Sequence, residues 1–185
     1  MSLTPSTMMP LGTEAPDFNL QDVISGTNKT LADVMGVEGL VVMFICAHCP
    51  YVKSIEEELS IVARHYQHLG VEFVAISSND SESHPEDNPA GLKEQAENHD
   101  FNFPYLFDET QDVAKAYDAA CTPDFFLFGK DLKCVYRGRF DASTPGNNEP
   151  VNGEDLSMAI DNLLEGQPPL EEQIPSMGCN IKWKG

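Results

Sequence analysis

The order of apolar and polar residues divides the chain into short strands and helices. Residues 40–46 and 71–77 are apolar runs without a clean polar face, as expected of central strands that are covered on both sides. Between them, apolar residues recur at steps of 3 or 4, at Val52, Ile55, Leu59, Val62, Tyr66 and Leu69. This spacing predicts one amphipathic helix over residues 50–69, ending at Gly70.

The rest of the pattern predicts further strands, helices and loops in alternation. These are extended pieces at 12–20 and 28–34 around a Ser25-Gly26 turn, a surface loop at 79–89, a helix at 90–98, a strand at 103–107, a helix at 110–118, a hairpin with strands 125–128 and 133–137, a loop at 141–153 and a helix at 154–165. Strands that alternate with helices predict a layered α/β sheet. Reactive groups of such sheets gather at the carboxyl ends of the parallel strands.

The sequence Cys46-Ala47-His48-Cys49-Pro50 stands at the carboxyl end of the first apolar run. Proline is favoured at the first helical position, so Cys49 is expected at the N-cap. The positive end of a helix dipole favours the thiolate, and helix N-termini lower cysteine pKa values from about 8.5 to about 7 or below. The pattern therefore predicts Cys49 as a nucleophile and Cys46 as the nearest thiol able to form a disulfide with it. This mechanism requires that solvent reach Cys49.

Composition narrows the range of partners and compartments. The 185 residues suit one domain, and 11 Lys and Arg against 30 Asp and Glu give a formal charge of −19. Nucleic acid and anionic membranes are poor partners for such a surface, and no apolar run reaches the length of a transmembrane helix. Five cysteines without regular spacing argue against a secreted disulfide framework. We expect a soluble cytoplasmic protein.

Four stretches carry a resemblance to a known family: residues 12–18 (Gly-x-x-Ala-Pro-Asp-Phe), 44–53 (Phe-Ile-Cys-Ala-His-Cys-Pro-Tyr-Val-Lys), 120–128 (Ala-Cys-Thr-Pro-Asp-Phe-Phe-Leu-Phe) and 176–184. They resemble the thioredoxin fold and, within it, the peroxiredoxin-like branch of the alkyl hydroperoxide reductase/thiol-specific antioxidant superfamily. The resemblance implies an α/β three-layer sandwich, with a mixed central sheet flanked by helices and an N-terminal extended segment. It assigns residues 11–166 to this domain and 167–185 to a C-terminal tail.

The resemblance also implies a substrate groove beside the two thiols. In the thioredoxin fold the proline that matches Pro123 is cis and faces the active cysteines. The backbone of the preceding residue, here Thr122, pairs there with the bound substrate. With His48 and Pro50 beside the thiols, the candidate groove residues are Thr122, Pro123, His48 and Pro50.

Departures from the family patterns bear on the reaction. Thioredoxins place a second cysteine three residues after the N-cap cysteine, where this chain has Val52. The other alignment, with Cys46 first and Cys49 second, leaves Pro50 in an unusual place. Peroxiredoxins use Pro-x-x-x-Thr-x-x-Cys, and here Val42 and Cys46 stand in place of the Pro and the Thr. Disulfide reduction is therefore expected rather than efficient peroxide reduction.

Two more cysteines are candidates for additional redox thiols. Cys121 precedes Thr122-Pro123 and is either a third redox thiol or a packing residue. The tail that holds Cys179 also carries Leu170, Ile174, Met177, Ile181 and Trp183, which a disordered tail would lack. We expect the tail to pack on its own body or on a second copy in a homodimer. There Cys179 is either a resolving cysteine or part of a purely structural tail.

The sequence thus predicts a thiol-dependent oxidoreductase in which Cys49 attacks a disulfide and Cys46 resolves the mixed disulfide. Its partners would be a protein or small-molecule substrate and a dithiol electron donor. No cofactor is expected, because no Gly-x-Gly-x-x-Gly follows a strand. Two alternatives stay open. One is a copper carrier using Cys46, His48 and Cys49, which are one ligand short of a closed zinc site. The other is a redox-switched binding module.

Overall fold

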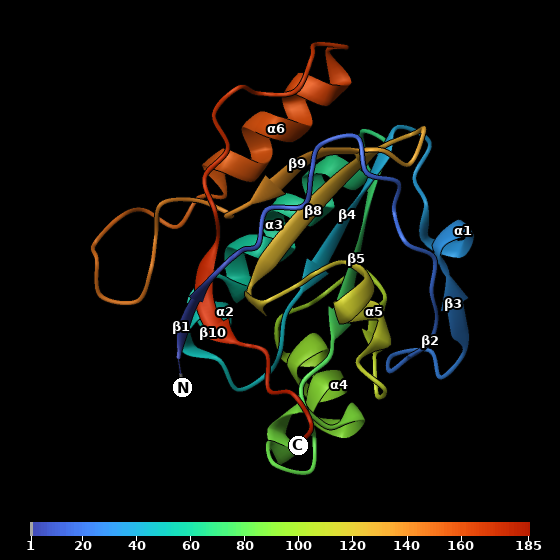
Figure 1. Cartoon of the computed structure of the whole chain (residues 1–185), viewed down its shortest axis with the longest axis vertical. Coiled ribbons are helices and arrows are strands. Elements are labelled where there is room, and N and C mark those ends of the chain that lie inside the picture. Colours follow the sequence, from blue (N-terminus) through green and yellow to red (C-terminus); the bar gives the residue numbers. More distant parts are fainter. Residues whose placement is uncertain (1) are drawn as a thin grey trace.

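A computed structural model describes residues 2–185, and its centre is a mixed sheet of seven strands (Figure 1). In spatial order the strands are β3 (Asn28–Thr30), β2 (Asn19–Asp22), β6 (Tyr105–Phe107), β5 (Val71–Ser77), β4 (Gly39–Phe44), β8 (Asp124–Gly129) and β9 (Cys134–Gly138). The β4–β5 and β5–β6 pairs are parallel, and the other pairs are antiparallel. Every residue of β4 is buried, so this apolar strand lies at the middle of the molecule.

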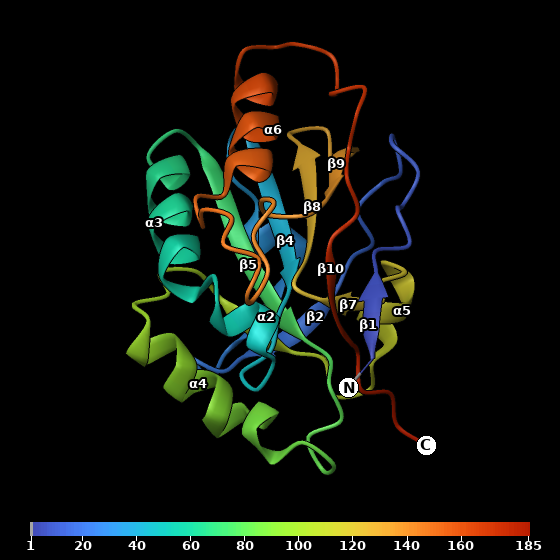
Figure 2. The same cartoon turned by 90° about the vertical axis from the view of Figure 1, so that its left-hand side faces the viewer.

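Helices cover both faces of this sheet, which gives three layers (Figure 2). One face carries α2 (Pro50–Lys53), α3 (Glu56–Gln67), α4 (Pro89–Asn98) and α6 (Glu154–Leu164). The other carries α1 (Leu31–Val34) and α5 (Asp112–Ala116). A 3-10 turn, η1 (Pro85–Asp87), precedes α4. The layers and the mixed sheet confirm the expected thioredoxin-like sandwich.

The prediction of one helix over residues 50–69 is wrong, because the structure has two helices there, α2 and α3. The backbone ladder changes at Ile55, whose N–H donates to the Val52 carbonyl three residues back instead of four. The Ser54 hydroxyl also donates to the Tyr51 carbonyl, at 3.0 Å. Cys49 therefore lies at the N-terminus of a four-residue helix, whose dipole is smaller than that of the predicted long helix.

A second sheet of three antiparallel strands brings both ends of the chain together, in the order β1 (Leu3–Pro5), β10 (Met177–Asn180) and β7 (Cys121–Thr122). Figure 2 shows β1 and β10 side by side at one edge of the molecule. In this sheet Cys179 is opposite Thr122. The tail thus packs on the body of its own chain.

The helices are short. Among residues 2–185, no helix has the length and apolar character needed to cross a bilayer.

Candidate functional site

The site is built where β4 ends and α2 begins, opposite the Thr122-Pro123 peptide bond. Cys49 is the N-cap of α2 and Pro50 its first residue, as the sequence predicted. The Thr122-Pro123 bond is cis, which confirms the expectation drawn from the family resemblance. The Cys49 sulfur lies 3.6 Å from the carbonyl oxygen of Thr122, so this sulfur faces the cis peptide bond.

Cys49 forms a disulfide with Cys179, 130 residues further along the chain, with a Cα–Cα distance of 6.4 Å. The expected partner, Cys46, is a free thiol in this state. Cys49 is 0 % exposed and Cys179, which lies on β10, is 1 % exposed. The solvent access that the predicted attack by Cys49 requires is therefore absent in the disulfide-bonded form.

Cys46 is buried directly beneath this site. Its sulfur lies 3.5 Å from the Thr122 hydroxyl oxygen, and its carbonyl accepts a hydrogen bond of 2.9 Å from Gln95. Gln95 in turn accepts a hydrogen bond of 2.7 Å from the Tyr105 hydroxyl and donates one of 3.1 Å to Glu56. Burial raises the pKa of the Glu56 carboxyl. The strand-to-helix turn that carries Cys46 is thus held by a buried polar network.

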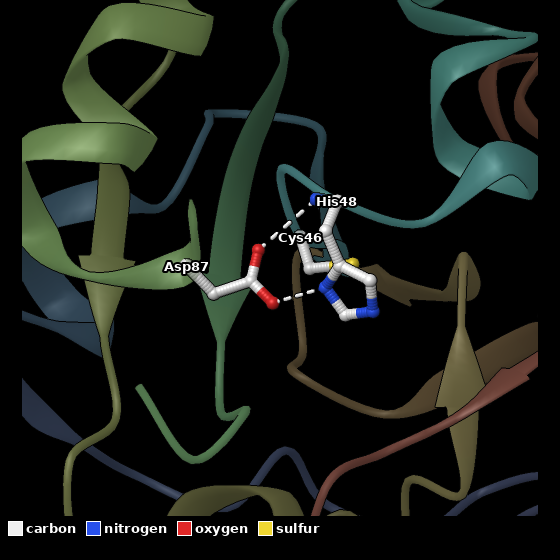
Figure 3. Close-up of side chains that lie close together, drawn as sticks. All are labelled: Cys46, His48 and Asp87. Carbon is white, nitrogen blue, oxygen red and sulfur yellow. Dashed lines mark hydrogen bonds and ion pairs between the residues drawn. The ribbon is translucent and has the colours of Figure 1, made fainter. Parts of the chain in front are cut away.

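His48 and Asp87 form an ion pair beside Cys46 (Figure 3). The Asp87 carboxylate also accepts from the backbone N–H groups of Ala47, at 2.7 Å, and His48, at 3.1 Å, and from the Asn79 amide, at 2.9 Å. The hydrogen bond to Asp87, and then that to the Cys46 sulfur, raises the pKa of His48 to about 10. His48 is therefore a cation at neutral pH.

Asp87 is the residue that sequence reasoning missed. It lies in the segment predicted to be a surface loop, yet its side chain is fully buried. Neighbouring acidic residues such as Glu82 and Glu86 are exposed, and nothing in the local sequence separates Asp87 from them. Only the fold shows that η1 turns this carboxylate towards His48.

Donor atoms of Cys46, His48 and Asp87 lie within 4.8 Å of one another, which is close to the arrangement of a metal site. The carboxylate oxygens, however, already accept four N–H groups, and a metal ion would have to replace some of these hydrogen bonds. Cys49, the other thiol that the copper hypothesis needs, is held in the disulfide. In this state the donor set fits an ion pair better than a metal.

The predicted groove residues do not all face the same space. A cavity of about 120 Å³ includes Pro123, Tyr51 and Met177 in its lining. Thr122 pairs with β10, and His48 faces Asp87 instead of this cavity. Pro50 is exposed at the start of α2.

The two remaining thiols are buried and protonated. Burial raises the pKa of Cys121 far above its usual range and that of Cys134 to about 11. The Cys121 sulfur contacts the Pro123 carbonyl oxygen at 3.8 Å. Cys134 packs in the core on the opposite face of the sheet from Cys49.

A cis-proline facing a cysteine at a helix N-terminus, on this sandwich, defines a thiol protein of the thioredoxin fold. The model of the AhpC/TSA family matches residues 11–137, and the chain belongs to that family. Family membership supports a thiol-dependent oxidoreductase. A search of curated proteins gave no match.

Solved structures agree with this assignment. The chain is 55 % identical to an uncharacterized conserved protein from Geobacillus kaustophilus, with a TM-score of 0.97 and coverage of 100 % of this chain and 97 % of that one. It is 44 % identical to a hypothetical protein from Sinorhizobium meliloti 1021, with a TM-score of 0.96 and coverage of 98 % and 99 %. The peroxidoxin BcpB from Mycobacterium tuberculosis is 19 % identical, with a TM-score of 0.64 and coverage of 86 % and 98 %, and shares the fold.

Proposed function

We propose that the protein is a thiol–disulfide oxidoreductase in which Cys49 attacks the substrate and Cys179 resolves the mixed disulfide. The observation that carries this proposal is the bond between the N-cap cysteine of α2 and a cysteine on the strand that pairs with Thr122. Sequence reasoning gave the resolving role to Cys46, whereas the structure pairs Cys49 with Cys179.

The reaction needs two thiols and one disulfide. The Cys49 thiolate attacks one sulfur of the substrate disulfide, so that a Cys49–substrate bond forms and a substrate thiolate leaves. The Cys179 thiolate then attacks the Cys49 sulfur, releasing the second substrate thiolate and forming the Cys49–Cys179 bond. Two electrons pass from the protein to the substrate. In the next half-cycle an external dithiol supplies two electrons that reduce the Cys49–Cys179 disulfide again.

The place of β10 suggests how a substrate binds. An extended peptide gains affinity when its backbone pairs with an exposed strand edge. β10 pairs with β7 and presents Cys179 to Cys49, so the tail already has the position proposed for a substrate strand. The cavity lined by Tyr51, Pro123 and Met177 lies next to this strand and would accept a side chain near the substrate cysteine.

Peroxide reduction is the less favoured reaction. A peroxidase of the family would use a threonine hydroxyl three residues before the attacking cysteine to orient the peroxide, and this chain has Cys46 there. The hydroxyl of Thr122 lies 3.5 Å from the Cys46 sulfur. We therefore expect disulfide reduction to exceed peroxide reduction.

The test measures insulin reduction and peroxide consumption, each driven by dithiothreitol. Cys49→Ser should lose at least about 100-fold of the disulfide-reducing rate, because the nucleophile is gone. Cys179→Ser should lose about tenfold. Cys134→Ser is the matched control, since this cysteine lies in the opposite core, and should keep the wild-type rate.

Two further measurements separate the competing functions. A double variant, Cys46→Ser with Cys179→Ser, should accumulate a Cys49–substrate mixed disulfide that mass spectrometry detects. Full activity of Cys49→Ser would reject the proposal. So would a wild-type protein that reduces neither substrate but holds one copper ion per chain, which is the behaviour of a carrier.

A further inference from the structure

The Cys49–Cys179 disulfide is closed to thiols from solution. Both cysteines are buried, and β10, the strand that carries Cys179, is paired on both edges, with β1 and with β7. Beyond β10 the tail is also held, because the Lys182 carbonyl accepts from the Asp80 N–H at 2.8 Å and from the Gln111 amide at 2.9 Å. A dithiol donor therefore cannot reach the disulfide while this segment stays in place.

One buried thiol is placed to reach the disulfide from inside. Cys46 packs in the same core as Cys49 and Cys179, and Cys134 packs in the other core. Side chains alternate along a strand, and the Thr122 hydroxyl points towards the Cys46 sulfur, so Cys121 points to the opposite side of β7. Cys46 and Cys49 both contact Thr122, through its hydroxyl at 3.5 Å and its carbonyl oxygen at 3.6 Å.

The His48 side of the His48–Asp87 pair places an imidazolium within 4.8 Å of the Cys46 sulfur. Asp87 orients the imidazole through Nδ1 and is itself held by the N–H groups of Ala47 and His48, so the pair cannot easily turn away. Negative charge is shared by three sulfurs during thiol–disulfide exchange, and a preorganised cation in a water-poor site stabilises such charge. The geometry is that of a nucleophile, a nearby imidazole and a carboxylate that orients the imidazole.

We propose that Cys46 is an internal redox thiol that attacks the Cys49 sulfur of the Cys49–Cys179 disulfide, with His48 and Asp87 as positioning residues. The Cys46–Cys49 bond forms as the Cys49–Cys179 bond breaks. The proton that Cys46 loses is balanced by the proton that the released Cys179 thiolate takes up, and no electrons are gained or lost. β10 is then no longer covalently attached, and an external dithiol can reduce Cys46–Cys49. This inference rests on the proposed function, because it describes how the same disulfide is reopened.

The test follows reduction of the preformed disulfide in the absence of substrate. Oxidised full-length protein is mixed with dithiothreitol, quenched with acid, alkylated with a maleimide and mapped by mass spectrometry. Cys46→Ala should slow the loss of the Cys49–Cys179 bond at least about tenfold. His48→Gln should slow it about three- to tenfold in the wild-type background and leave it unchanged in the Cys46→Ala background. His68→Gln, at an exposed position, is the control and should match wild type.

A second measurement does not depend on removing Cys46. Oxidised Cys179→Ser should contain a Cys46–Cys49 disulfide, because Cys49 then has one buried thiol within reach. Absence of this bond, or wild-type reduction rates in Cys46→Ala, would overturn the inference. An equal slowing by His48→Gln in both backgrounds would show that His48 has only a structural role. Substrate turnover does not enter these measurements, so their failure would leave the assays of the proposed function standing.

Discussion

At the scale of single residues, Asp124 shows how closely the site is tied to its surroundings. It follows the cis-proline, is buried, and accepts a hydrogen bond of 2.8 Å from the Ser6 hydroxyl on Oδ1. Its other oxygen, Oδ2, has no hydrogen-bond partner. Burial raises the pKa of Asp124 to about 7, so a carboxyl next to the cis-proline changes charge near neutral pH.

Asp124 predicts a loss of stability as pH rises. Because its pKa is about 7 in the folded protein against an ordinary value of 3.8, the folded state binds the proton more tightly. The contribution of Asp124 to the free energy of unfolding should then fall by on the order of a few kcal/mol between about pH 4 and pH 7. Above about pH 7 it should stay constant. Urea unfolding of wild type and Asp124→Asn at several pH values measures this slope. The slope should be smaller in the variant, and equal slopes would contradict the assignment.

His48 predicts a loss of stability in a higher pH window. Its pKa is raised from 6.5 to about 10, so the stabilisation from the His48–Asp87 pair should be complete below about pH 6.5 and lost as pH rises to about 10. Asp87, Cys46 and the tilted ring of His84 are the titratable groups against it, and Lys182 interacts with Cys46 and Asp87. Removing one partner of a buried pair costs roughly 3 kcal/mol. His48→Gln should therefore be less stable than wild type at pH 6 by about this amount and nearly equal at pH 10. An equal difference at both pH values would count against the ion pair.

The sequence was informative about residues whose role follows from local chemistry. Proline after Cys49 predicted the N-cap, and the family motif around Pro123 predicted the cis bond. The Cys49–Cys179 pairing joins positions 130 residues apart, and no local pattern encodes such a contact. The role of Asp87 likewise depends on where η1 lies against the turn that carries His48.

At the scale of elements, β10 depends on a glycine. A Cβ atom at Gly178 would lie 2.0 Å from the carbonyl oxygen of Thr122 and 2.7 Å from its carbonyl carbon, so no other residue fits without moving the backbone. This close approach allows Cys179, the next residue, to reach Cys49.

Gly178→Ala should push β10 away from β7. We expect at least about a tenfold faster reduction of the Cys49–Cys179 bond by dithiothreitol, because β10 no longer pairs closely with β7. The maleimide assay measures this rate. Gly146→Ala is a control for the loss of a glycine, because a Cβ there would meet no atom within 4 Å. Its rate should equal that of wild type, although its own φ of +87° makes alanine slightly strained. An unchanged rate in Gly178→Ala would show that the strand tolerates a side chain.

The break between α2 and α3 could not be read from the pattern. Apolar residues continue at helical spacing through Val52, Ile55 and Leu59, and all three are buried on one face. The change of hydrogen bonding at Ile55 leaves that face intact. Periodicity reports which side of a helix is buried and does not report a local tightening of its backbone.

At the scale of the whole molecule, the fold was predictable because its central strands are apolar throughout and its helices are amphipathic. β4 and β5 lie where the two apolar runs predicted them. The small sheet of β1, β10 and β7 was not predictable, because its strands are two to four residues long and come from distant parts of the chain. This sheet is also the part that covers the site.

The disulfide should make a large contribution to global stability. It closes a loop across a sequence separation of 130 residues, and loop-closure entropy assigns roughly 5 kcal/mol to such a crosslink. Hydrogen bonds of the tail remain after reduction, so we expect a loss of about 3–5 kcal/mol. Urea unfolding of wild type with and without a reductant tests this, and the double variant Cys46→Ser with Cys179→Ser should give one curve under both conditions. Equal stability of oxidised and reduced wild type would contradict it.

The strand β10 also sets the affinity that another protein needs in order to pair with β7 beside Cys49. β10 is part of the same polypeptide, so after reduction it competes for β7 at an effective concentration on the order of millimolar. A segment of another protein binds β7 only if it pairs with β7 more strongly than the tethered β10 does, or if that protein first displaces the tail. Selectivity among substrates would then depend on how well a substrate segment displaces β10, more than on the reactivity of the substrate sulfur.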